Sequence, residues 1–211
     1  MVRSTEARPS PARRVLIQLA HPVLERSRIT RPLVDAIRDL PGVTINDLYE
    51  RYPTMAIDPS AEQALLLEHD VIVFHHPFYW YSTPAILKQW QDIVLEYGWA
   101  YGEGGDKLRG KLTLNALTTG GPEDAYRAGG SNRFTVRELL APWEQTASLC
   151  GMRWLPPWVV HGVLRLAGTD DVARHQRSYR ALIEALRDDR VDVVRAAPLQ
   201  RINDLEQEDA P

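Results

Sequence analysis

The residues best suited to chemistry lie in three loops, each of which follows a predicted strand. The first loop carries two hydroxyl groups and a guanidinium, on Ser27, Thr30 and Arg28. These groups donate hydrogen bonds to phosphate oxygens, and the start of a helix adds unpaired N–H groups that favour an anion. The first loop therefore predicts an anion site. The alternative is that Ser27 only caps the helix that follows.

The second loop contains four consecutive rings, Phe78, Tyr79, Trp80 and Tyr81, within residues 75–102. Aromatic rings stack on flat, conjugated ligands and bury a large area when they do so. The run therefore predicts a site for such a ligand. Packing at a core corner or at a dimer interface is the alternative, and the two interpretations are compatible.

The third loop is Thr118-Thr119-Gly120-Gly121. Glycines let the main chain approach a ring closely, and backbone N–H groups at such a place stabilise negative charge on a ligand. Taken alone, the pattern is more typical of a turn.

The elements that position these loops alternate between strands and helices, which predicts a mostly parallel sheet covered on both faces. The apolar run at residues 71–74 is typical of a strand buried on both faces, and Ser82-Thr83-Pro84 is expected to start a helix. Strands are expected at residues 15–19, 43–47, 71–75, 111–117 and within 153–163. Helices are expected at residues 28–40, 60–68 (capped by Ser60), 84–97, 131–149 (kinked or divided near Pro142) and 170–187, with a loop at 48–59.

Residues 75–102 resemble a segment of the flavodoxin-like NAD(P)H–quinone oxidoreductases. The likeness continues at LRGK (108–111), TTGG (118–121) and CGMRWLPP (150–157), and it spans roughly residues 15–186. The closest branch is the ancillary oxidoreductase subunit of glutathione-regulated potassium efflux systems. The resemblance implies a flavodoxin-like α/β fold, with a five-stranded parallel sheet in the order 2-1-3-4-5 and helices on both faces. In that fold the ligand crevice lies where the strand order reverses.

The resemblance also implies a flavin site and one catalytic tyrosine. The implied flavin-binding residues are His21, Ser27, Arg28, Ile29, Thr30, Phe78, Tyr79, Trp80, Tyr81, Thr118, Thr119, Gly120 and Gly121. Thr30 departs from the family, which often has a small amide residue there. Tyr126 matches a tyrosine near the reacting ligand, whereas the family's proton-donating histidine, about six residues further on, is missing. Residues 129–132 (GGSN) stand in its place.

The function that the resemblance implies is an FMN-dependent NAD(P)H–quinone oxidoreductase with two-electron, ping-pong transfer. FAD is the alternative cofactor. A regulatory flavin-binding subunit of a potassium efflux transporter, with little activity of its own, is the alternative function, and a one-electron flavodoxin is a third. The family further implies a homodimer, and the six tryptophans of the chain favour aromatic residues at its interface.

Composition sets the remaining expectations. A formal net charge of −3 with no basic stripe argues against nucleic-acid binding, and the lone cysteine, Cys150, fits a reducing compartment. No metal site is expected, because His75 and His76 are neighbours on a strand and point to opposite faces. The sequence predicts a flexible lead (1–14), one flavin-binding domain (15–187) and a loose acidic tail (188–211). We expect a cytoplasmic protein, peripheral to the membrane only through a partner.

Overall fold

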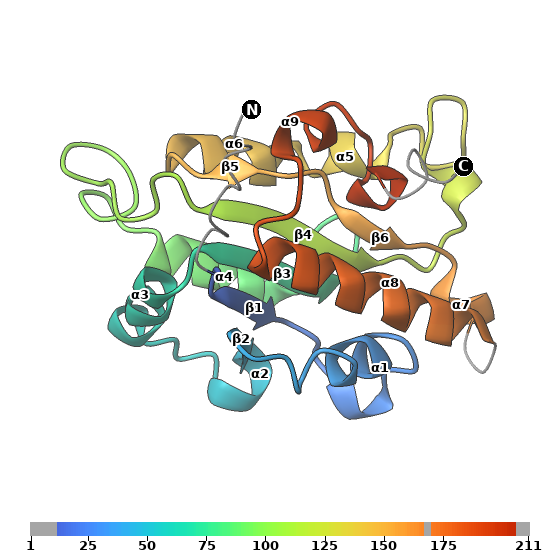
Figure 1. The fold of residues 1–211 in the computed structure, drawn as a ribbon, viewed down its shortest axis with the longest axis horizontal. Helices are drawn as coiled ribbons and strands as arrows, with labels where there is room; N and C mark the ends of the chain where they lie inside the picture. The colour runs from blue at the N-terminus through green and yellow to red at the C-terminus, as the bar shows by residue number, and fades with distance from the viewer. Residues whose placement is uncertain (1–11, 167–169, 206–211) are drawn as a thin grey trace, which may run out of the picture.

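A central parallel sheet organises the computed structural model, which describes residues 12–166 and 170–205 (Figure 1). Its strands follow the order β2-β1-β3-β4-β5, and β6 also pairs with β4. The predicted order is confirmed, with six strands in place of five. The strands are β1 (Val15–Leu19), β2 (Val43–Asp47), β3 (Val71–Pro77), β4 (Leu112–Thr118), β5 (Arg153–Trp154) and β6 (Trp158–Val160).

The extra strand arises because Pro156-Pro157 divides the expected fifth strand. Proline lacks the N–H group that a sheet interior requires. Before the prolines, β5 pairs with Leu112 and Thr113 at the start of β4, and after them β6 pairs with residues 116–118 at its end. Two strands, β4 and β6, therefore finish side by side at the carboxyl edge of the sheet.

Helices cover both faces of the sheet, so β1, β3 and β4 are buried along their whole length. Leu33 of α1 and Ile183 of α8 belong to one hydrophobic cluster, and Leu66 of α3 and Trp90 of α4 belong to the other. The helices are α1 (Thr30–Asp35), α2 (Leu48–Arg51), α3 (Pro59–Glu68), α4 (Ala85–Val94), α5 (Val136–Leu139), α6 (Ala141–Leu149), α7 (Val163–Leu166), α8 (Asp170–Arg187) and α9 (Val193–Ala196), with 3-10 turns η1 (Leu24–Arg26), η2 (Glu123–Ala125) and η3 (Ile202–Asp204).

Two helix starts differ from the prediction because aspartates cap them. Asp47 accepts hydrogen bonds from the N–H groups of Tyr49 and Glu50, so residues 48–51 form α2 where a loop was expected. Asp58, and not Ser60, caps α3, and Pro59 occupies its first turn. An N-cap carboxylate both satisfies unpaired N–H groups and complements the helix dipole.

Three other helices differ in length. The predicted helix at 28–40 is α helical only over α1, and Ile37 and Leu40 then make tighter i→i+3 bonds before the chain turns at Gly42. The α4 helix begins at Ala85 after Pro84, without the predicted side-chain cap. The helix expected at 131–149 is divided, as predicted, into α5 and α6, and a capping box at Thr135 delays its start.

The buried Glu62 side chain of α3 connects β1, β2 and α4 on one face of the sheet. Glu62 is fully buried and accepts hydrogen bonds from Gln18 (2.8 Å), Asn46 (2.9 Å), the Tyr52 hydroxyl (2.9 Å) and the Trp90 indole (2.8 Å). A buried charge is tolerated only with such full pairing. The cluster therefore fixes the packing of one face of the sheet.

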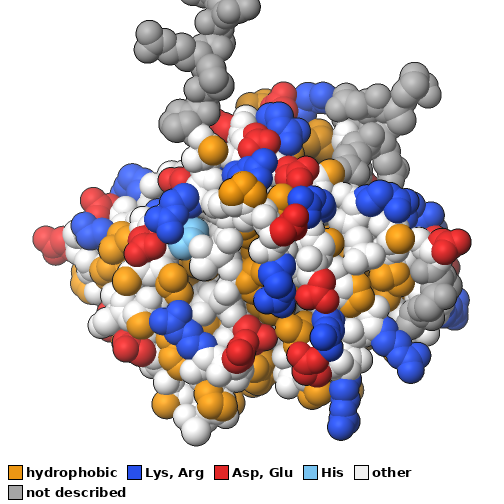
Figure 2. Space-filling view, turned by 60° about the horizontal axis from the view of Figure 1, so that its bottom comes forward, with side chains coloured by type: hydrophobic (Ala, Val, Ile, Leu, Met, Phe, Trp, Pro, Cys, Tyr) orange, Lys and Arg blue, Asp and Glu red, His pale blue; other side chains and the backbone are white. Residues whose placement is uncertain are grey.

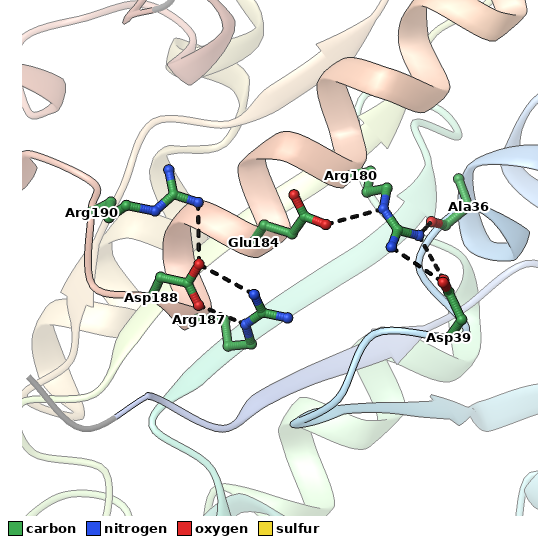
Figure 3. Close-up of polar contacts among 7 residues, drawn as sticks. All are labelled: Ala36, Asp39, Arg180, Glu184, Arg187, Asp188 and Arg190. Atoms are coloured by element: carbon green, nitrogen blue, oxygen red, sulfur yellow. Dashed lines mark hydrogen bonds and ion pairs between the residues drawn. The ribbon is translucent and has the colours of Figure 1, made fainter. Parts of the chain in front are cut away.

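The Arg180 side chain ties α8 to the amino-terminal part of the chain (Figure 3). Arg180 of α8 donates to the carbonyl of Ala36 (2.6 Å) and to the carboxylate of Asp39 (2.6 Å), and it pairs with Glu184 (3.1 Å). Gln176 donates to the carbonyl of Pro32 (3.0 Å). The α8 helix therefore adds hydrogen bonds at the carboxyl end of α1, to the Ala36 carbonyl and to the Pro32 carbonyl, which also accepts the N–H of Ala36.

Part of the segment expected to be a loose tail packs on the domain. Ala196 of α9 and Ile202 of η3 are buried in the same cluster as α8. Residues 1–11 and 206–211, which carry most of the predicted lead and the end of the predicted tail, lie outside the described residues.

Neither the described helices nor the surface charge on the face in Figure 2 suggests a membrane span or a patch of one charge sign. No helix among residues 12–166 and 170–205 is long and apolar enough to span a bilayer. On the face in Figure 2, basic side chains are interspersed with acidic ones.

Candidate functional site

A cleft of about 410 Å³ lies at the carboxyl ends of β1, β3 and β4, where the strand order reverses. We call it the first cleft. It gathers residues from all three predicted loops. It is lined by His21, Arg26, Ser27, Arg28, Ile29, Thr30, Pro77, Phe78, Tyr79, Thr118, Gly120, Val163 and Leu164.

The first loop contributes polar side chains to the lining of the first cleft. The Ser27 hydroxyl accepts the N–H of Thr30 (2.9 Å), which closes the turn before α1. Its own proton remains available to a ligand. The His21 Nδ1 accepts the N–H of Val23 (3.2 Å), and burial lowers the pKa of this imidazole. The neutral ring therefore carries its proton on Nε2 and has a donor to offer.

The second loop divides its four rings between the cleft and the solvent. Phe78 is buried and, with Tyr79, lines the first cleft. Trp80 and Tyr81 do not line it, and Trp80 is 93% exposed. Both have left-handed backbones, with φ of 51° and 61°. Such strain in two non-glycine residues is typical of functional loops.

The third loop is divided in the same way. Thr118 and Gly120 line the first cleft, whereas Thr119 and Gly121 do not. A Cβ atom added to Gly120 would approach only Leu164, at 3.9 Å, so a side chain there would occupy the cleft. The glycine leaves this space open for a ligand.

A second cleft, of about 660 Å³, contains Tyr126, the predicted catalytic residue. The Tyr126 ring centroid lies 6.2 Å from that of Phe78, which lines the first cleft, and 5.4 Å from that of His161. Tyr126 therefore stands between the two clefts. Burial raises the pKa of its hydroxyl above the ordinary value of a tyrosine. The second cleft is lined by Glu123, Asp124, Tyr126, Arg127, Thr135, Val136, Arg137, His161, Gln200, Arg201 and Asp204.

Sequence reasoning missed His161. It follows β6 directly, and its Nδ1 lies 3.1 Å from the Thr119 Oγ1. Burial, and next the charge of Arg201, lower the pKa of His161 to about 4. A histidine thus lies beside Tyr126, although it comes from a different loop than the one where the family resemblance would place it. Its position just after an apolar strand run was the available signal.

His75 and His76, which the sequence analysis considered and rejected as metal ligands, lie in the core. His75 and His76 are fully buried in β3, and burial lowers the pKa of His75 to about 3 and of His76 to about 4. The His75 Nδ1 lies 3.0 Å from the Tyr179 hydroxyl. Within the described ranges, no three His, Cys, Asp or Glu side chains gather to hold a metal.

Comparisons with known proteins agree with this fold. A family model described as "flavodoxin-like fold" matches residues 13–183. The ancillary protein KefG of the glutathione-regulated potassium-efflux system of Pectobacterium atrosepticum is 46% identical over 166 residues, covering 79% of this chain and 90% of that protein.

Two solved structures are similar as well. General stress protein 14 of Treponema denticola, in complex with FMN, superposes with a TM-score of 0.78 at 40% identity, covering 82% of this chain and 99% of that one. An NADPH-quinone reductase from P. pentosaceus superposes with a TM-score of 0.73 at 36% identity, covering 80% and 96% respectively.

Proposed function

Because the chain belongs to the family with the flavodoxin-like fold, we propose that it is an FMN-dependent NAD(P)H–quinone oxidoreductase. The observation that carries this proposal is the first cleft, whose lining combines hydroxyl, guanidinium and backbone N–H donors with aromatic rings. Its residues suit a flavin mononucleotide. A relative with the same fold was solved with FMN, and another is an NADPH-quinone reductase.

The residues of the first cleft have separate tasks in this proposal. Ser27, Thr30 and Arg28 hold the phosphate through hydroxyl, N–H and guanidinium donors. Phe78 and Tyr79 pack against the ring system, and Gly120 lets the backbone approach it. Trp80, Tyr81, Thr119 and Gly121, which do not line the cleft, act on this site only through their neighbours.

When bound, FMN supplies the redox chemistry, taking hydride from NAD(P)H and passing two electrons to a quinone that also takes up two protons. The protein supplies a proton-bearing group close to the ring site. Burial keeps the Tyr126 hydroxyl protonated, and its place between the clefts suits a hydrogen bond to the quinone carbonyl.

Cofactor identity and kinetics test this proposal together. Flavin released by heat from the purified protein should run as FMN on a column, and stoichiometric FAD would refute the choice of mononucleotide. In this proposal NAD(P)H and the quinone occupy the same site beside the flavin, one after the other. Turnover with NAD(P)H and a soluble quinone should therefore give parallel double-reciprocal lines. Intersecting lines would mean that both substrates bind at once.

A regulatory flavin-binding subunit of a potassium efflux transporter is the second candidate. The observation in its favour is the 46% identity to an ancillary protein of such a system. The two functions separate in one measurement, the anaerobic oxidation of reduced, flavin-loaded protein by quinones. Oxidation within the time of turnover supports the enzyme, and no oxidation by any quinone supports the regulatory subunit. We also propose that the protein acts in the cytoplasm, where NAD(P)H is supplied. We further propose that it is a homodimer.

A further inference from the structure

A hydroxyl group and an amide group border an open space beside Gly121, at the end of the third loop. A Cβ atom added to Gly121 would lie 3.5 Å from the Tyr126 hydroxyl oxygen and 3.7 Å from the Asn132 Nδ2. Both groups donate hydrogen bonds, and the glycine leaves the space between them open. We call this space the Gly121 gap.

The Gly121 gap adjoins the first cleft without belonging to its lining. Gly120, the preceding residue, lines the first cleft, and so does Phe78, whose ring centroid lies 6.2 Å from that of Tyr126. Tyr126 and Asn132 do not line it. A flavin in the first cleft is therefore held by other residues, whereas a group that projects from a ligand stacked on that flavin can enter the gap.

Contacts from two segments fix the Asn132 amide beside the gap. Its Oδ1 accepts the hydroxyl proton of Tyr81 (3.2 Å), which reaches it from the second loop. Its backbone N–H donates to the carbonyl of Ala125 (3.0 Å), the last residue of η2. The left-handed backbone of Tyr81 is part of the strained turn described above, so this strain serves to bring the second loop to Asn132.

The Asn132 amide retains one donor group and one acceptor site for a ligand. Within the described part of the chain no hydrogen bond engages its Nδ2, and its Oδ1 accepts only the Tyr81 proton, which leaves a second lone pair. A donor and an acceptor side by side on one planar group match a carboxamide, which carries the same two groups in reverse order. A quinone offers only acceptors, so it can use the Nδ2 donor alone.

We propose that Asn132 recognises the carboxamide of the nicotinamide ring and that Tyr81 positions it. The carboxamide oxygen accepts from Asn132 Nδ2, and the carboxamide NH2 donates to Asn132 Oδ1. The inference rests on the proposed function, in which the nicotinamide and the quinone use the site beside the flavin in turn. It adds the residue that favours the nicotinamide in that shared site, because a site built to bond an NH group discriminates against a ligand without one.

The two half-reactions allow each substrate to be tested alone. Flavin-loaded protein is reduced by NAD(P)H without oxygen in a stopped-flow spectrometer, which gives a half-saturating concentration. Protein reduced with one equivalent of dithionite is oxidised by a soluble quinone in the same way. The reduction is then repeated with the acetylpyridine analogue of the dinucleotide, in which a methyl group replaces the NH2 of the carboxamide.

Asn132→Ala should raise the half-saturating concentration of NAD(P)H about tenfold, because two hydrogen bonds to the ligand are lost. With the analogue the increase should be only about threefold, since the bond to its carbonyl alone is lost, and the value for the quinone should rise by no more than about threefold. Positive φ occurs at Arg133 and not at Asn132, so alanine adds no backbone strain.

Two further variants separate recognition from a general change in the loop. Tyr81→Phe removes the bond that positions the amide, and it should give the same order of effects as Asn132→Ala at a smaller size. Ser131→Ala changes the exposed residue next to Asn132 and is the matched control, which should alter none of the three values. Equal increases for NAD(P)H and its analogue in Asn132→Ala would overturn the proposal, because loosening of the loop affects both alike.

A binding measurement gives a readout without turnover. The tetrahydronicotinamide dinucleotide keeps the carboxamide but donates no hydride, and its Kd is obtained from the change in flavin absorbance on titration. This Kd should rise about tenfold in Asn132→Ala and stay constant in Ser131→Ala. The Kd for FMN, from the quenching of flavin fluorescence, should be that of the parent in both variants. A weaker affinity for FMN in Asn132→Ala would mean that the amide serves the flavin, and it would refute the inference.

The same data separate a failure of the inference from a failure of the proposed function. If NAD(P)H does not reduce the flavin of the parent protein, the proposed function fails and the inference falls with it. If the parent is reduced and Asn132→Ala behaves as the parent does in reduction and in binding, only the assignment of Asn132 is wrong.

Discussion

The Nδ1 atom of His161 lies 3.1 Å from the hydroxyl oxygen of Thr119, which itself donates to the Gly121 carbonyl at 2.8 Å. Since the Thr119 proton is committed to Gly121, the oxygen accepts the proton of His161 Nδ1. This assigns the tautomer of the neutral histidine and leaves Nε2 as an acceptor. Thr119 is fully buried and thereby links the third loop to the wall of the second cleft.

Thr119→Val should therefore destabilise the protein by about 1–3 kcal/mol, because it leaves the His161 N–H without its acceptor. Thr113→Val is the matched control. Thr113, at the start of β4, is also buried, but its hydroxyl has no hydrogen-bond partner among the described residues. Urea unfolding should show a loss for Thr119→Val and no loss for Thr113→Val. Equal effects would mean that the Thr119 hydroxyl makes no useful bond.

Tyr126→Phe should lower quinone turnover by about 10²-fold or less without releasing flavin. This is the low end of the range of about 10²–10⁴-fold that a positioned proton donor contributes. The comparison is Tyr126→Ala, which removes the ring that separates the clefts. If Tyr126 only packs against the ligand, Tyr126→Phe will be silent and Tyr126→Ala will raise KM. Steady-state kinetics with flavin-loaded protein distinguish these outcomes.

Ser27→Ala and Thr30→Ala together should weaken FMN binding, each hydroxyl contributing about 1.5–3 kcal/mol as a donor to a charged group. Arg28→Ala should add a loss that diminishes with salt. The Ser27 hydroxyl also accepts the Thr30 N–H, so apo-protein stability must be measured in parallel. A fall in apo stability with an unchanged Kd for FMN would show that Ser27 serves only the turn.

Trp80→Gly should abolish the proposed homodimer at micromolar concentration. Trp80 is 93% exposed, and large exposed rings are typical of interfaces. Glycine adopts the left-handed backbone of this position without strain, so the monomer should remain at least as stable. Val194→Ala, an exposed apolar site on α9, is the control. Sedimentation of the parent as a monomer would contradict the prediction directly.

Stability should fall as the pH drops from about 6.5 towards 4. Burial lowers the pKa of His75 to about 3, and of His76 and His161 to about 4, from 6.5. The unfolded chain therefore binds more protons in this window, and stability present above pH 6.5 is lost below it. Each histidine contributes about 1.4 kcal/mol per pH unit. In His161→Gln, the slope of the unfolding free energy against pH, measured with urea, should correspond to one proton fewer. An unaltered slope would place the pKa of His161 in the folded protein near 6.5.

The sheet and the first cleft were predictable because strong local patterns specify them. Residues 15–19 and 71–74 are apolar without alternation, which occurs in parallel strands buried on both faces. Once their order is known, the loops after them must meet at one edge. This is why His21, Ser27, Thr30 and Phe78 fall in one cleft.

The second cleft was not predictable from local sequence. His161, Tyr126 and Arg201 come from three segments without a common motif, and only the path of β6 and of residues 197–204 brings them together. Residues 197–204 bury few apolar side chains, such as Ile202, and are held mainly by hydrogen bonds. Their polar composition therefore resembled that of a loose tail.

The hydrogen bonds from α8 to α1 mean that an amino-terminal helix depends on a segment that is synthesised much later. Gln176 and Arg180 reach carbonyls of Pro32 and Ala36, each 144 residues earlier in the chain. With only six residues, α1 is too short to persist without such partners. A chain that ends before α8 contains every residue that lines the first cleft, yet its first loop lacks the support that α8 gives to α1. We therefore expect ligand binding in the first cleft to require the chain through α8.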